Sequence, residues 1–130
     1  YVEQFYAKET SPQNGVTFRW STESSSVQVP AINSQTRTVT VWLNRGARPL
    51  SAAPAIANLY LDDQFVGAAE PTDDFEPFSF NIPVELTSQI INKENAAVLR
   101  IDSNTWSPLI ELGSSDDRRL GVMVDRVTVN

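Results

Sequence analysis

Acidic residues placed side by side are the first feature of this sequence that could take part in catalysis. Three such pairs occur, at 62–63, 73–74 and 116–117. Two carboxylates held about 5 to 9.5 Å apart can hydrolyse a glycosidic bond. Adjacent residues of a strand point to opposite faces of the sheet, so these neighbours do not make such a pair. A hydrolase is therefore the least favoured of three functional classes.

The chain contains no cysteine and no histidine. This excludes thiolate nucleophiles, Cys/His zinc sites and the Ser-His-Asp triad. The sequence also lacks a glycine-rich phosphate loop and a nucleophile elbow. We therefore predict that the protein is not an enzyme and that it uses no cofactor.

The stretch EPTDDFE at 70–76 gathers four carboxylates on one expected loop, and these are Glu70, Asp73, Asp74 and Glu76. Calcium prefers such hard oxygen ligands. The segment lacks the ligand spacing and the central glycine of an EF-hand. A solvated acidic hairpin is the favoured interpretation, and a calcium site is the alternative.

The stretch SSDDRRLGV at 115–123 sets two acids against two arginines before an apolar run. Asp accepts hydrogen bonds from the backbone of a loop, and Arg caps carbonyls or pairs with a carboxylate. A leucine after this quartet would enter the core, and the glycine would permit a close backbone approach. We predict a structural clasp, with one arginine directed to solvent, made of Asp116, Asp117, Arg118, Arg119, Leu120 and Gly121.

The net charge of −6 is unevenly distributed. Between Arg48 and Lys93 lie seven acidic residues and no Lys or Arg, whereas the rest of the chain is nearly balanced. An acidic middle section repels a phosphate backbone, which argues against nucleic-acid binding. No apolar stretch approaches the roughly 20 residues that cross a bilayer.

Alternating apolar and polar residues, interrupted by turn residues at short intervals, predict an all-β protein. We expect strands at 2–8, 17–21, 26–29, 36–43, 56–62, 64–68, 75–82, 97–102 and 121–129. One helical turn is expected within 84–95, with Leu86, Ile90 and Ile91 facing inward. This pattern suits a two-sheet antiparallel β-sandwich of jelly-roll type, formed as a single domain by residues 1–130.

Strand phase separates core residues from exposed ones. Val39, Val41 and Leu43 share one face and are expected in the core, which turns Trp42 outward. Tyr60 is likewise out of phase with its apolar neighbours. Four other aromatics are expected to fill the core, and these are Phe18, Trp20, Phe78 and Phe80. The last strand changes phase between 124 and 127, which indicates that both its faces are covered or that a β-bulge lies near 125–126.

Three motifs carry a resemblance to known domains: FRWS at 18–21, SNTWSP at 103–108 and DDRRLG at 116–121. They resemble the galactose-binding-like, jelly-roll β-sandwich domains appended to prokaryotic, often membrane-embedded, glycosyltransferases. The resemblance covers roughly residues 15–129, and its last motif is the most specific; the segment 50–76 matches no part of the pattern. It implies an accessory domain of a longer protein, located outside the cytoplasm or associated with a membrane through that parent.

The favoured function is a non-catalytic binding or interaction domain of a larger bacterial surface or membrane-associated protein, with a carbohydrate ligand. Sugar rings stack on exposed aromatic faces, and flanking polar groups bind their hydroxyls. Trp42 is the first choice for such a platform, with Tyr60 beside it and Thr40 and Asn58 as hydrogen-bonding neighbours. The alternative is a structural or protein-interaction module without sugar affinity, in which other domains of the parent protein cover these rings.

Overall fold

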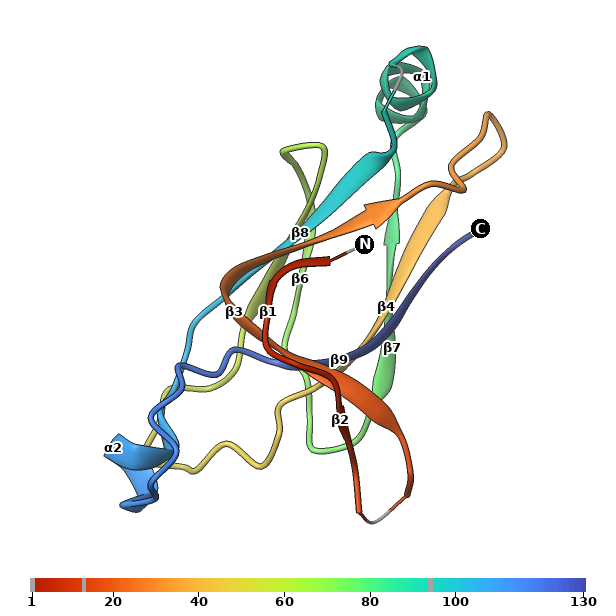
Figure 1. The fold of residues 1–130 in the computed structure, drawn as a ribbon. Helices are drawn as coiled ribbons and strands as arrows, with labels where there is room; N and C mark the ends of the chain where they lie inside the picture. Colours follow the sequence, from red (N-terminus) through yellow and green to blue (C-terminus); the bar gives the residue numbers. More distant parts are fainter. Residues whose placement is uncertain (1, 13, 94) are drawn as a thin grey trace.

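The structure is a computed structural model that describes residues 2–12, 14–93 and 95–130. Its strands are β1 (Val2–Phe5), β2 (Glu9–Thr10), β3 (Thr17–Val29), β4 (Thr38–Asn44), β5 (Ala57–Leu61), β6 (Gln64–Ala69), β7 (Glu76–Asn81), β8 (Ala97–Ser103) and β9 (Met123–Val129). Two helices, α1 (Val84–Asn92) and α2 (Pro108–Leu112), lie at opposite ends of the molecule (Figure 1).

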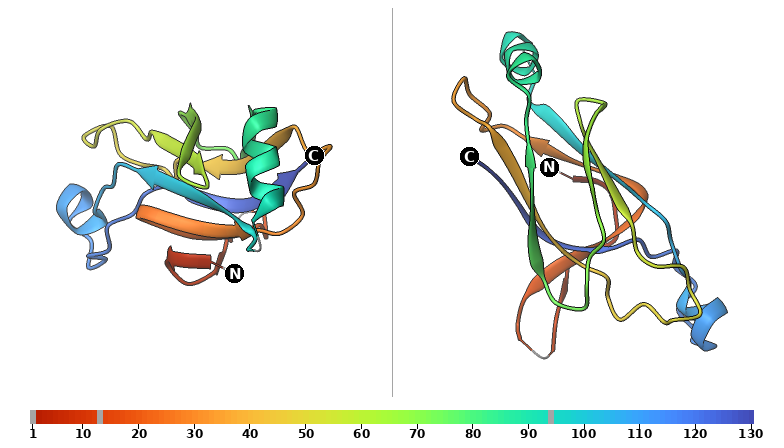
Figure 2. Two further views of the ribbon diagram at one scale, coloured as in Figure 1. Left: turned by 90° about the horizontal axis from the view of Figure 1, so that it is seen from above. Right: turned by 180° about the vertical axis from the view of Figure 1, so that it is seen from behind.

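The long strand β3 belongs to both layers of the sandwich. Its first part pairs with β9 at Arg19 and Trp20, and its last part, from Ser24 to Val29, pairs with β8. The first sheet therefore contains β6, β5, β8, the end of β3 and β1, and the second contains the start of β3, β9, β4 and β7 (Figures 1 and 2). All of these pairs are antiparallel, which confirms the predicted two-sheet jelly-roll class, although the two strands expected at 17–21 and 26–29 are one strand.

Strand phase correctly predicted the centre of the core. Val39, Val41 and Leu43 are fully buried between the sheets, together with Leu59 and Leu61. Of the four aromatics expected in the core, those at 18 and 20 are buried in a second, smaller cluster, and those at 78 and 80 are partly buried against the main one.

Of the two explanations offered for the phase change in β9, a bulge is the one that the structure contains. Val41 opposes Val127 whereas Leu43 opposes Val124, so β9 carries one extra residue within 125–126, opposite Trp42. The insertion restores the inward phase, and Val127 is partly buried against the core.

The helices differ in part from the prediction. Leu86 and Ile90 are buried as expected, but Ile91 is 44% exposed because it lies about 100° around the helix from Ile90. The predicted range also includes position 94, which lies outside the described residues. Helix α2 was not predicted. Its N-terminus is capped by Ser107, whose hydroxyl accepts a hydrogen bond from the backbone amide of Ile110. In the described ranges, neither helix has the length and apolar character needed to cross a membrane.

Candidate functional site

The outer face of the first sheet carries a broad polar surface, which we call the Tyr60 face. Directly opposed residues of an antiparallel sheet lie on the same face, so the register aligns their side chains in rows. One row runs through Phe65, Tyr60, Arg100 and Ser26, and the next runs through Ala68, Asn58, Asp102 and Ser24. Tyr60 and Asn58, two of the four predicted ligand-binding residues, are therefore neighbours.

Arg100 is held at the centre of the Tyr60 face. Its guanidinium carbon lies 4.3 Å from the centroid of the Tyr60 ring. Its Nε donates to Asp102 Oδ1 at 3.2 Å, and its Nη1 donates to Asp63. Ser24 donates its hydroxyl to the same Asp102 oxygen at 2.7 Å. Two carboxylates and one ring thus hold Arg100 in place.

Phe65 extends the aromatic surface beyond Tyr60. The two ring centroids are 5.5 Å apart, with 64° between the ring planes. At 59% exposure, Phe65 is the most exposed aromatic residue of the described ranges. Sequence reasoning missed it because alternation along β6 puts Phe65 in step with the buried Ala69. A bulge in β6 beside Tyr60 shifts the register by one residue and turns Phe65 outward.

A pocket of about 290 Å³ adjoins these rows, lined by Glu23, Ser24, Asn58, Asp102, Ser103 and Asn104. The side-chain amide of Asn58 makes no hydrogen bond with any described residue. An amide offers both a donor and an acceptor, as a sugar hydroxyl does. The pocket therefore places hydrogen-bonding groups beside the aromatic rings.

The other two predicted residues, Trp42 and Thr40, lie on the outer face of the second sheet, which we call the Trp42 face. The bulge in β9 sets Arg126 against Trp42, with the guanidinium carbon 4.1 Å from the ring centroid. The Thr40 hydroxyl lies 2.8 Å from that of Ser79. The structure does not bring Trp42 together with Tyr60, because the two rings lie on opposite outer faces of the sandwich.

The predicted clasp contains one paired arginine, Arg118. Its Nη2 lies 2.8 Å from Asp116 Oδ2, and its Nη1 lies 3.1 Å from Glu9 Oε2. Hydrogen bonding to the Arg118 side chain lowers the pKa of Asp116, and the same contact raises the pKa of Arg118. Asp117 and Arg119 are exposed, so Arg119 is the arginine directed to solvent.

Leu120 and Gly121 connect this loop to the core. Leu120 is buried and exchanges two backbone hydrogen bonds with Trp106, of 2.8 and 2.9 Å. A Cβ on Gly121 would lie 2.4 Å from Ser21 Oγ, so only glycine allows this close approach to β3.

Arg48 is a structural residue that sequence reasoning treated only as part of a turn. It is 2% exposed and is the only buried charged side chain among the described residues. Its guanidinium donates to the carbonyl oxygens of Ala53 at 3.0 Å, Asn104 at 3.0 Å and Gly121 at 2.9 Å. Burial lowers its pKa. Two of these partners are 56 and 73 residues away, so no local pattern distinguishes Arg48 from a surface arginine.

The acidic loop at 70–76 makes contacts within the protein. Asp73 pairs with Arg45 at 3.0 Å, and Glu76 accepts a hydrogen bond from a threonine hydroxyl of the same loop. Glu70 and Asp74 are exposed. Across the described ranges, no three acidic side chains gather closely enough to hold a metal ion.

Comparisons with known proteins bear on the fold. No protein-family model matches the sequence, and no curated protein matches it. The structure is similar to that of a family 35 carbohydrate-binding module from an environmental isolate, with a TM-score of 0.55 and 12% identity. The match covers 100% of this chain and 92% of that chain. At this identity the likeness establishes the β-sandwich fold alone.

Proposed function

We propose that this chain is a non-catalytic carbohydrate-binding domain whose ligand lies on the Tyr60 face. The observation that carries this proposal is the exposed ring of Phe65 beside Tyr60, with Arg100 and Asn58 next to it on an open sheet face. A sugar stacked on such a ring gains about 1 kcal/mol, and the amide supplies directional hydrogen bonds. The likeness to a carbohydrate-binding module supports this function.

The Trp42 face is the second candidate for the same function. Trp42 has the larger ring, and Thr40 and Ser79 provide hydroxyls beside it. One side of the ring is already in contact with Arg126. A sugar on that side would have to displace a cation–π contact of about 0.5 to 1 kcal/mol. We therefore rank this face below the Tyr60 face.

We further propose that the domain is an accessory part of a larger bacterial surface or membrane-associated protein, outside the cytoplasm. The motifs at 18–21, 103–108 and 116–121 support this, since they resemble domains appended to glycosyltransferases. The full-length chain is the direct test. A parent with neither an export signal nor a membrane anchor would contradict the proposed location.

A protein-interaction module is the alternative, and one surface favours it. Leu50 is 95% exposed, and Ile110 and Leu112 are exposed on α2. A hydrogen bond of 2.7 Å between Ser51 and Glu111 brings the two segments together. Contiguous exposed aliphatic side chains are typical of protein interfaces.

A hydrolase has less support than either binding function. Asp62, one of its candidate carboxylates, is held in an ion pair with Lys93.

The test begins with a glycan array on the intact domain, followed by calorimetric titration of the best ligand. Phe65→Ala should weaken binding about fivefold to tenfold, which corresponds to the loss of one stacked ring. The matched control is Trp42→Ala on the opposite face, which should retain wild-type affinity. Absence of binding to any glycan at millimolar concentration would contradict the function. Full affinity in Phe65→Ala would contradict the site.

A further inference from the structure

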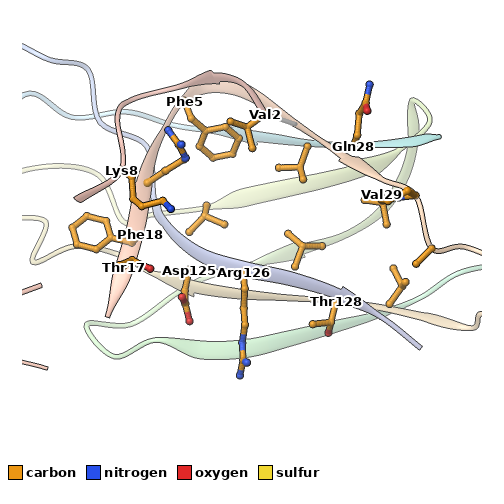
Figure 3. A pocket seen from close by; sticks show the side chains of 17 residues that line it. Val2, Phe5, Lys8, Thr17, Phe18, Gln28, Val29, Asp125, Arg126 and Thr128 are labelled. Atoms are coloured by element: carbon orange, nitrogen blue, oxygen red, sulfur yellow. The ribbon is translucent and has the colours of Figure 1, made fainter. Parts of the chain in front are cut away.

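A mostly apolar cavity at the seam between the two sheets has no role in the proposed function. β3 pairs with β9 only at Arg19 and Trp20, and among the described strands residues 125–129 of β9 pair only with β4. A cavity of about 410 Å³ opens between this edge and β1 (Figure 3). Phe5, Phe18, Val29 and Val127 contribute to its mostly apolar lining.

The dimensions of the cavity suit a narrow ligand. Its volume falls within the range of about 300 to 1,000 Å³ typical of small-molecule sites. It follows β9 from Val124 to Val129, which spans about 16 Å at roughly 3.3 Å per residue. Val127 and Val129 also pack against the main core, so a ligand here would touch the interior of the sandwich.

Two cations without a carboxylate partner line one end of the cavity. The Lys8 side chain extends toward the opening, and it makes no ion pair with a described residue (Figure 3). Arg19 donates its Nη1 to the carbonyl oxygen of Tyr6 at 3.2 Å and likewise has no carboxylate partner in the described ranges. Among the described residues that line the cavity, Asp125 is the only acidic one, and its carboxylate points to the opposite side of β9 from Phe5 (Figure 3).

We propose that this seam binds a fatty acid, a single aliphatic chain that ends in a carboxylate. The chain would lie along β9 against Phe5, Val29 and Val127, and the carboxylate would pair with Lys8 and Arg19. An aliphatic chain gains from leaving water for an apolar cavity, and a carboxylate forms strong charge-assisted hydrogen bonds to Lys and Arg. The site is separate from the Tyr60 face and does not depend on sugar binding there.

The experiment is a titration of the methyl-labelled domain with dodecanoate, kept below its critical micelle concentration and followed by NMR. Shifts are expected at the methyl groups of Val29, Val127 and Val129. Decanoate should bind about fifteenfold more weakly, because it lacks two methylenes and each contributes about fourfold. Dodecanol, which lacks the charge, should also bind about tenfold more weakly than dodecanoate.

Variants separate the charged end from the apolar lining. Lys8→Gln should lower the affinity for dodecanoate toward that for dodecanol and leave dodecanol unchanged. The matched control is Arg119→Gln, an exposed cation elsewhere, which should bind dodecanoate normally. Val2→Trp should block the cavity while the domain stays folded, because Val2 is 38% exposed at its border. Circular dichroism checks the fold.

Three results would overturn the proposal. The first is that millimolar dodecanoate leaves the valine methyl signals unchanged. The second is that dodecanol binds the wild-type protein as tightly as dodecanoate. The third is that dodecanoate binds a folded Val2→Trp protein with undiminished affinity.

Discussion

The two outer faces of the sandwich use the same contact, an arginine on an aromatic ring, in different ways. On the Tyr60 face, Arg100 is also paired with Asp63 and Asp102. On the Trp42 face, Arg126 makes no ion pair with any described residue. The cation–π contact holding Arg126 is worth only about 0.5 to 1 kcal/mol at an exposed site. Arg100 is therefore held in place on the Tyr60 face. Arg126, in contrast, lies over the Trp42 ring through one weak contact, and a ligand can displace it.

An outward-facing position on a strand is therefore not enough to make an aromatic ring a binding platform. Trp42 and Tyr60 both point away from the core, yet an arginine contacts each of them. The Tyr60 face differs because a second ring, that of Phe65, lies beside the ring of Tyr60 and is exposed to solvent. Side chains that are already held in place lose less conformational entropy when a ligand binds, which favours the Tyr60 face as the binding site.

The largest expected effect concerns Arg48, which lies on neither outer face, touches the pocket beside the Tyr60 face only through the backbone carbonyl of Asn104, and so serves as a reference for general stability. Arg48→Met removes a donor from three carbonyl oxygens, and those of Ala53 and Gly121 are left without a side-chain donor from any described residue, the second in a buried position. We expect the free energy of unfolding to fall by about 3 kcal/mol or more, with no change in the glycan affinity of the folded protein. Denaturant titration and calorimetry measure the two quantities. A loss under about 1 kcal/mol would show that the carbonyls find other donors.

Removing the two stacked arginines tests the comparison directly. Arg100→Ala leaves Asp63 and Asp102 without their cation, and should cost about 1 to 2 kcal/mol of stability and about tenfold in glycan affinity. Arg126→Ala should cost under about 1 kcal/mol, leave that affinity unchanged and shift tryptophan fluorescence to the red as Trp42 meets water. Equal losses of affinity in the two variants would remove the distinction between the faces.

The same distinction between paired and free arginines applies in the clasp. Arg118→Ala should lower stability by about 1 kcal/mol at neutral pH, and Arg119→Ala by a few tenths. The pKa of Asp116 is lowered in the folded state, so its pairing stabilises the fold above the unfolded value of about 3.9. That contribution is lost as pH falls through the lower folded value.

Denaturant titrations at pH 7 and pH 2.5 check the direction in which pH changes the stabilisation by the Asp116–Arg118 pair. The difference between wild type and Arg118→Ala should shrink at the lower pH. A difference that grows on acidification, or losses under a few tenths for both arginines at pH 7, would show that the loop is not a clasp.

The smallest expected effect is that of calcium. Binding raises the melting temperature only when the native state offers a site. In the acidic loop, Asp73 is paired with Arg45, and Glu70 and Asp74 are exposed. Millimolar calcium should therefore leave the melting temperature unchanged in differential scanning fluorimetry. An upward shift that a chelator reverses would show that the loop binds the ion.

Local alternation was sufficient to predict much of the fold. Val39, Val41 and Leu43 lie in the core because a regular strand repeats every two residues. The phase change in β9 indicated a bulge as one of two alternatives, because regularly alternating valines lie on both sides of it. In β3 the prediction divided one strand in two, because a strand that passes between sheets loses its regular phase where it crosses.

The candidate site was less predictable, for two physical reasons. The bulge in β6 follows no apolar repeat, so the sequence gives Phe65 the phase of the buried Ala69. The contact between Arg126 and Trp42, like that between Arg48 and Gly121, joins distant parts of the chain. The sequence alone could place Tyr60 and Asn58 on one face because they are two residues apart on one strand, whereas their neighbours Arg100 and Asp102 come from β8.

An NMR titration of the labelled domain with the best oligosaccharide from the array locates the ligand on one of the two faces. The ring signals of Phe65 and Tyr60 and the side-chain amide signals of Asn58 should shift together. The indole N–H signal of Trp42, on the opposite face, should stay in place. A titration that moves the Trp42 indole and leaves Phe65 and Asn58 unchanged would contradict the account and assign the ligand to the other sheet.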